Sequence, residues 1–175
     1  WETWLLIRDI DAISEQLKIL QNNNVTVLWR PLHEASGGWF WWGCRGKDAY
    51  LWLWNLLYER QTDYHKLNNL IWVWNGQDPD WYVGDDRCDI IGEDVYADAR
   101  NYDAQAMRFM NGAAASSRKM VALTENGVMT DPDRMARDGV YWSWFNIWVY
   151  DFITDSYGNI VDTYTEKSMI YKVYQ

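Results

Sequence analysis

Apolar runs recur along the chain and predict strands. They cover residues 25–34, 70–74, 88–96, 120–125 and 140–149. Each run is rich in β-branched or aromatic residues and lacks a regular alternation of polar and apolar positions, which is typical of strands buried on both faces of a sheet. Polar residues gather where the runs end. The pattern therefore predicts parallel strands whose carboxyl ends carry the polar chemistry.

Apolar residues return at helical spacing in the segments between these runs. They predict helices over residues 9–22, 47–64, 102–116 and 165–175. In the third of these helices, Met107, Met110 and Ala114 fall on one side. A methionine row at such spacing is typical of core packing, so we expect that side to face the core.

A further short helix is marked by the residues at its two ends. Asp131 is a favourable N-cap, Pro132 fits the first helical turn, and Gly139 suits the position after the last turn. With this helix included, strands and helices alternate along most of the chain. Such alternation predicts a single α/β domain built from β/α units.

Two architectures fit parallel β/α units: a (β/α)8 barrel of the TIM type and a doubly wound open sheet. No glycine-rich phosphate-binding turn follows any predicted strand, which favours the barrel. In such a barrel the active site lies at the carboxyl ends of the strands. We therefore expect Glu34, Asp94, Glu125 and Trp148 to converge on one mouth.

Glu34 and Glu125 stand at the ends of two predicted strands and form the minimal set for glycoside hydrolysis. One carboxylic acid protonates the leaving oxygen, while the other attacks the anomeric carbon or activates water. A surface glutamate beside core tryptophans is the alternative interpretation of Glu34, and spacing alone leaves it open. Strict alternation sends His33 and Glu34 to opposite faces, so both reach the site only if the strand bulges or ends at Leu32.

Composition limits the partners and cofactors. The formal net charge of −9 argues against binding to nucleic acid or to an anionic membrane surface, and no apolar run is long enough to cross a membrane. Fourteen tryptophans are more than core packing usually needs, and such rings suit stacking against flat apolar ligand faces, of which sugar rings are one kind, although each aromatic taken singly is more often a core residue. Because no His-x-x-x-His or Cys-x-x-Cys pair occurs, the sequence predicts no metal site and no cofactor. Cys44 and Cys88 are expected at opposite ends of strands, too far apart for a disulfide.

Several segments resemble a known family. Residues 29–34 (Trp-Arg-Pro-Leu-His-Glu) and 38–43 (Gly-Trp-Phe-Trp-Trp-Gly) resemble the acid/base segment of the glycoside hydrolase family 26 β-mannanases. Residues 68–74, 89–96 and 122–127 are similar to later segments of that family, in the same order. The resemblance covers almost the whole chain. It implies a retaining endo-β-1,4-mannanase with a (β/α)8 fold.

The resemblance also implies roles for individual residues. Glu34 resembles the acid/base at the end of the fourth barrel strand, and Glu125 resembles the nucleophile at the end of the seventh. Tyr96 looks like the tyrosine that hydrogen-bonds the nucleophile. For the platform below the sugar in subsite −1 we choose Trp148, with Trp144 as second candidate. The full set of expected substrate-binding residues is His33, Trp39, Asp94, Tyr96, Trp144 and Trp148.

The five predicted strands align with the fourth to eighth barrel strands of the family. Residues 1–175 are thus expected to be a partial catalytic domain that lacks the first three β/α units, and to be inactive or nearly so alone. The implied partners are β-mannan or manno-oligosaccharides and the missing amino-terminal part of the barrel. The implied location is extracellular, as a secreted enzyme either alone or within a multidomain polysaccharide-degrading enzyme.

Two alternative functions stay open on the sequence. One is another family 26 β-glycanase, acting on mixed-linkage β-glucan or β-1,3-xylan. The other is a non-catalytic carbohydrate-binding fragment that uses its tryptophans alone.

Overall fold

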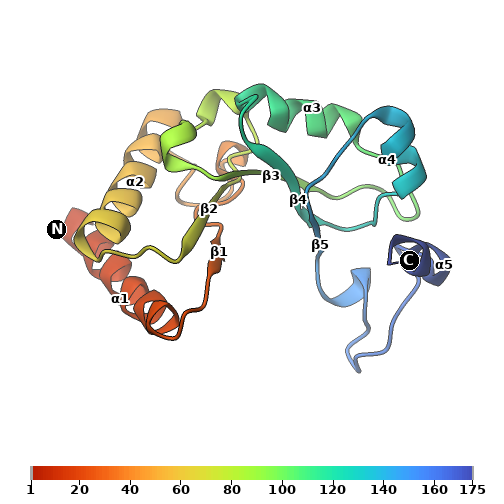
Figure 1. Cartoon of the computed structure of the whole chain (residues 1–175), viewed down its shortest axis with the longest axis horizontal. Coiled ribbons are helices and arrows are strands. Elements are labelled where there is room, and N and C mark those ends of the chain that lie inside the picture. Colours follow the sequence, from red (N-terminus) through yellow and green to blue (C-terminus); the bar gives the residue numbers. More distant parts are fainter. Residues whose placement is uncertain (1, 175) are drawn as a thin grey trace. The chain divides into compact units, whose positions relative to one another are not determined.

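The computed structural model describes residues 2–174 (Figure 1). Contacts between residues divide the chain into two compact units, one ending at Ile90 and the other beginning at Ile91. In the described part of the chain, no helix is both long and apolar enough to cross a membrane.

The first unit combines helices with a pair of parallel strands. Its elements are α1 (Glu2–Asn22), β1 (Val27–Trp29), α2 (Lys47–Glu59) and β2 (Leu70–Trp74). Short 3-10 turns cover residues 35–37, 79–81 and 85–87, and α2 continues into one π-helical turn over residues 60–64. Val27 lies opposite Leu70, and Trp29 lies opposite Trp72. This register aligns the carboxyl ends of β1 and β2.

Aromatic side chains of α2 form much of the core of the first unit. Tyr50 and Trp54 are fully buried, and the Trp54 ring lies 5.6 Å from the Trp72 ring of β2. Burial of a large apolar side chain stabilises such a contact by roughly 2–3 kcal/mol. An ion pair links α1 to the π-helical turn after α2: Arg60 of that turn donates to both carboxyl oxygens of Asp11 in α1, at 2.7 and 2.8 Å. These hydrogen bonds lower the pKa of Asp11 to about 2.

The second unit continues the alternation of strands and helices. Its elements are β3 (Ile90–Val95), which begins at the unit boundary, α3 (Ala106–Ala115), β4 (Met120–Asn126), α4 (Pro132–Asp138), β5 (Phe145–Ile147) and α5 (Lys167–Val173). A 3-10 turn covers residues 150–152. β4 and β5 are parallel, and strand order in the sheet follows chain order, β1-β2-β3-β4-β5. This order is the one that successive β/α units produce.

The core of the second unit lies between α3, β4 and the segment before β5. Val121 and Leu123 of β4 are buried together with Val140 and Trp142. Phe109 of α3 meets the Trp142 ring nearly edge-on, with ring centroids 5.2 Å apart. The Trp142 indole N–H donates to the Ala104 carbonyl at 2.9 Å, so its polar atom is satisfied inside the core.

Two predicted strands are shorter than the apolar runs that indicated them. The run over residues 25–34 forms a strand only at Val27–Trp29, and the run over 140–149 only at Phe145–Ile147. Outside β5, Val140 and Trp142 are buried in the core, whereas Val25, Tyr141 and Val149 of the two runs are exposed. By contrast, β2 has the predicted bounds, Leu70–Trp74.

The prediction about the methionine row on α3 is wrong. Met107 and Met110 are 87% and 69% exposed, and Ala114 is exposed as well. The helix instead turns Phe109 and Ala113 toward the core, one position before the predicted residues. Phe109 buries more apolar surface than either methionine, which explains why its side of the helix is the one that packs.

Other local predictions are confirmed. The Asp131 carboxylate caps α4 by accepting the Asp133 amide at 2.9 Å, and Gly139 ends the helix in the left-handed conformation at φ 67°. Neither cysteine forms a disulfide; Cys44 is exposed and Cys88 is buried. The helix predicted over 9–22 starts earlier, at Glu2, and the closing helix is α5, with Gln175 outside the described residues.

Candidate active site

Glu34 lies in a turn after β1, not in the strand. The strand ends at Trp29, earlier than the sequence predicts, and both Leu32 and Glu34 take left-handed backbone conformations, at φ 52° and 51°. The Glu34 amide donates to the Asn75 carbonyl at 2.7 Å, and Arg30 donates to the Asn75 side-chain oxygen, also at 2.7 Å. Asn75 is fully buried at the end of β2. The end of β2 thus anchors the backbone of Glu34 through an unusual turn.

The indole of Trp39 contacts the Glu34 carboxylate. Its Nε1–H donates to Glu34 Oε2 at 3.1 Å, while the Trp39 side chain is 64% exposed. The ring crosses Gly37 so closely that a Cβ there would lie 2.0 Å from it. Gly37 therefore gives Trp39 the room to reach Glu34.

His33 packs among the same group of aromatics. Its ring lies 4.8 Å from the Phe40 ring and 5.6 Å from the Trp42 ring. The Trp42 indole also donates to the His33 carbonyl at 2.7 Å. These contacts fix the backbone directly before Glu34. That His33 itself orients the site stays a prediction.

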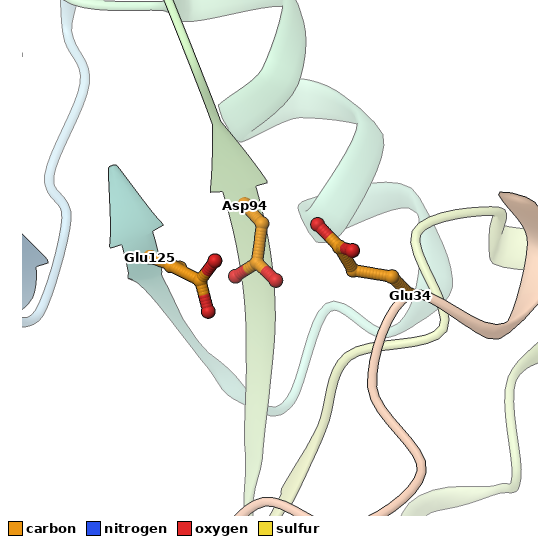
Figure 2. Close-up of side chains that lie close together, drawn as sticks. All are labelled: Glu34, Asp94 and Glu125. Atoms are coloured by element: carbon orange, nitrogen blue, oxygen red, sulfur yellow. The ribbon is translucent and has the colours of Figure 1, made fainter. Parts of the chain in front are cut away.

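Asp94 and Glu125 come together at the carboxyl ends of β3 and β4 in the second unit. Figure 2 shows their carboxyl groups next to one another, and their oxygens lie within 4.8 Å. Both side chains are 5% exposed. Thr124 donates to Asp94 Oδ1 at 2.7 Å and to the Glu93 carbonyl at 3.2 Å. Figure 2 also draws Glu34, on the turn of the first unit.

A β-bulge sets the direction of the Glu125 side chain. Leu123 pairs with Phe145 and Asn126 with Ile147, so β4 spans three residue steps where β5 spans two. The extra residue falls at Thr124 or Glu125. Bulges of this kind re-aim side chains next to active sites. Here two consecutive residues at the bulge contact neighbouring side chains: Thr124 contacts Asp94 of β3, and Glu125 contacts Tyr96, which follows β3.

Tyr96 directly follows β3, and its hydroxyl donates to Glu125 Oε1. The contact that the sequence predicts between these two side chains is therefore present. The Tyr96 side chain is 47% exposed. A carboxylate that accepts a hydrogen bond from a neighbouring hydroxyl is held in a more defined orientation.

The two candidate platforms lie at opposite ends of β5. Trp148 follows the strand, is 42% exposed, and donates its amide to the Asn126 carbonyl at 2.9 Å. Trp144 precedes the strand and is half-buried, and its backbone carbonyl accepts a hydrogen bond from the Leu123 amide at 3.0 Å. Because Glu125 stands at the carboxyl end of β4, the position of Trp148 favours it over Trp144 as the platform.

Sequence comparison decides the family of this chain. Residues 2–173 match the domain described as glycosyl hydrolase family 26. The chain belongs to glycosyl hydrolase family 26. A mannan endo-1,4-beta-mannosidase of Thermothelomyces thermophilus is 47% identical over 156 residues, which cover 89% of this family 26 chain and 32% of that protein. Mannan endo-1,4-beta-mannosidase A of Piromyces sp. is 44% identical, over 90% of this chain and 26% of that protein. The chain thus spans about a third or less of these relatives.

Solved family 26 structures share the fold. The GH26-CBM35 β-(1,4)-mannanase of Podospora anserina is 48% identical with a TM-score of 0.82, over 86% of this chain and 34% of that one. A β-mannanase from a symbiotic protist of the termite Reticulitermes speratus, solved with a gluco-manno-oligosaccharide, is 35% identical with a TM-score of 0.86, over 98% of this chain and 52% of that one. These findings confirm the predicted family and fold, five parallel strands of an incomplete (β/α)8 barrel.

Glu93 is a buried acidic residue of this family 26 chain that was not singled out from the sequence. It stands beside Asp94 on β3 but points to the other face, where it is 1% exposed. Arg108 of α3 lies 2.8 Å from Glu93 Oε2, and Asn111 donates to Oε1 at 2.7 Å. Burial outweighs both partners and raises the pKa of Glu93 to about 7. A carboxylate inside a buried strand needs such partners, and that need was a usable signal.

The raised pKa of Glu93 predicts a pH-dependent stability. The folded state keeps a proton that the unfolded chain loses above its pKa of about 4.5. The stabilisation is therefore complete below pH 4.5 and is lost as the pH rises through 7. We expect the free energy of unfolding to fall by about 2–3 kcal/mol between pH 4.5 and pH 8. Urea unfolding at several pH values measures this.

Glu93→Gln should remove most of that pH dependence, because glutamine carries no titratable proton. The matched control is Glu59→Gln, an exposed side chain paired with Arg87 at 2.8 Å, which should retain it. Equal pH dependence in wild type and Glu93→Gln would contradict the assignment.

Proposed function

We propose that this chain is the carboxyl-terminal part of the catalytic domain of a retaining endo-β-1,4-mannanase. The proposed substrates are internal bonds of mannan, galactomannan or glucomannan. The observation that carries the proposal is the buried Glu125, bound by Tyr96 at the carboxyl end of a strand in a family 26 chain. The named activities of the relatives and the oligosaccharide in one solved complex support the substrate class.

In the first step, Glu125 is the nucleophile. Its carboxylate oxygen attacks the anomeric carbon, the glycosidic carbon–oxygen bond breaks, and Glu34 gives its proton to the leaving oxygen. The product is a glycosyl ester on Glu125. This step needs the two carboxyl groups about 5–5.5 Å apart.

In the second step, Glu34 acts as base. It takes a proton from water, the water oxygen bonds to the anomeric carbon, and the ester bond to Glu125 breaks. Two inversions retain the β-configuration. Water replaces the departed sugar beside Glu34, so the same residue serves both steps.

The other candidate residues hold the substrate and the carboxylates in place. Tyr96 orients the attacking carboxylate through its hydroxyl. Trp148 forms the platform below the sugar that reacts, and Trp39, which is open on the surface and bonded to Glu34, contacts the leaving sugar. His33 and Asp94 complete the set through contacts next to the two glutamates.

The proposed enzyme contains more of the barrel than this chain provides. The first three β/α units come from outside this chain and complete the barrel, and the enzyme is secreted, either alone or within a multidomain enzyme. The chain's net charge of −9 fits a neutral polysaccharide partner better than nucleic acid or an anionic membrane.

A substrate panel tests the proposed function. The full-length protein that contains this chain is incubated with galactomannan, lichenan and β-1,3-xylan, and reducing ends are measured. We expect turnover of galactomannan with β-anomers as the first products, seen by NMR, and little or no turnover by the 175-residue chain alone. Faster hydrolysis of lichenan or xylan would assign another β-glycanase activity. Binding without product, unchanged in Glu34→Gln and Glu125→Gln, would assign a binding module instead.

A further inference from the structure

Phe152 contacts the tyrosine that binds Glu125. It lies in the 3-10 turn after β5, in the segment that follows Trp148 (Figure 1). Its ring centroid is 5.5 Å from that of Tyr96, at an interplanar angle of 57°. It also contacts Tyr164, with ring centroids 4.3 Å apart. The Phe152 ring thus packs against two tyrosines that come from different parts of the second unit.

Phe152 and Tyr96 also meet over Gly127. A Cβ at Gly127 would lie 2.7 Å from Phe152 Cε1 and 3.1 Å from Tyr96 Cδ1. The Gly127 amide donates to the Val95 carbonyl at 3.2 Å, which fixes this glycine against the end of β3. Both rings therefore rest on a fixed piece of backbone two residues after Glu125. Only glycine leaves room for them there.

This packing matters because Tyr96 stands at the rim of the site. Its side chain is 47% exposed, and in the rotamer that donates to Glu125 the edge of its ring lies against Gly127. A half-exposed ring without a packing partner populates several rotamers. Phe152 covers the edge of Tyr96 from the segment after β5 and so selects the rotamer that donates to Glu125.

We propose that Phe152 is a positioning residue for the nucleophile: it holds Tyr96 on Glu125 and couples the segment after β5, which begins with Trp148, to the reacting carboxylate. The inference rests on the proposed role of Glu125. Phe152 itself touches no reacting atom. Its effect on the reaction therefore passes through Tyr96, and that route is what the experiment examines.

A double-mutant cycle in the full-length protein tests the route. Phe152→Ala should lower kcat on galactomannan about tenfold with little change in KM, since the affected contact acts on the chemical step. In a Tyr96→Phe background, the same change should cost less than about twofold, because the hydroxyl that Phe152 positions is gone. Phe152→Tyr keeps the aromatic contact and should restore kcat to near wild type. Additive losses in the double variant would overturn the proposal.

A second measurement does not depend on activity. In protein labelled with 3-fluorotyrosine, the ¹⁹F signal of Tyr96 is identified by its loss in Tyr96→Phe. It should shift in Phe152→Leu, which keeps apolar bulk in the turn, and in Glu125→Gln. An unchanged signal in Phe152→Leu would refute the positioning role even if the enzyme is active. If the signal shifts but the protein does not hydrolyse mannan, the contact between Phe152 and Tyr96 is supported and the proposed function is refuted.

Discussion

Replacement of Glu125 by alanine is expected to lower kcat/KM for mannan by at least about 10⁴-fold. The change removes the oxygen that attacks the anomeric carbon, and no neighbouring group replaces it at the same place. Folding should survive, because Tyr96, which donates a hydrogen bond to Glu125, is half-exposed and its hydroxyl can turn to water. Hydrolysis of galactomannan by the full-length variant measures the loss.

Azide distinguishes a missing nucleophile from a damaged fold. In Glu125→Ala the small anion enters the space of the lost carboxylate and attacks once, so the product is an α-glycosyl azide of inverted configuration. Glu166→Ala is a matched control in the same unit, at a side chain that is 46% exposed and 3.6 Å from Arg100. It should retain full activity. More than about 1% residual activity in Glu125→Ala without azide would show that another group attacks.

Strong local signals in the sequence predicted the elements they belong to. The run Leu70–Trp74 is bounded by polar residues and matches β2, and the cap at Asp131 gives the start of α4. Apolar runs that also contribute to the core from loops were misleading. Val140 and Trp142 are buried although they lie outside β5. Hydrophobicity indicates burial, and burial alone does not distinguish a strand from a packed loop.

Backbone conformation near Glu34 was beyond the reach of the sequence. Leu32 and Glu34 adopt φ values of 52° and 51°, which non-glycine residues rarely take, so no composition rule indicates them. The hydrogen bond from the Glu34 amide to the carbonyl of Asn75, which directly follows β2 and lies 41 positions later in the chain (75 − 34), stabilises this turn. Tertiary contacts of that range override the local preference of the residues.

The candidate site was predictable where one residue type has one chemical use. Two glutamates at the ends of predicted strands indicate glycoside hydrolysis, whereas the contact of Tyr96 with Glu125, which is present, was implied by the family resemblance alone. Phe152 carries no such signal, because a phenylalanine after a strand is ordinary core material. Its role can be inferred only from the two rings that the fold brings against it, those of Tyr96 and Tyr164.

The loss of activity caused by Glu34→Ala is expected to depend on the leaving group of the substrate. The loss caused by Glu125→Ala is not. On mannan, where the leaving sugar oxygen needs a proton, kcat/KM should fall by about 10²–10⁴-fold. On a 2,4-dinitrophenyl β-mannoside, whose phenolate leaves without protonation, kcat/KM should fall less than about tenfold. For this substrate the second step becomes slow, since no base activates water, and the glycosyl ester accumulates.

Azide again separates the roles, now with the opposite product. In Glu34→Ala it attacks the glycosyl ester on Glu125 without needing a base, so kcat on the dinitrophenyl substrate recovers and the product is a β-glycosyl azide of retained configuration. Glu15→Ala, at a side chain that is 70% exposed on α1, is the control and should behave as wild type on both substrates. An α-azide from Glu34→Ala would exchange the assignments of the two glutamates. Equal losses on both substrates would show that Glu34 does not deliver the proton, because only a proton donor is spared when the leaving group needs no proton.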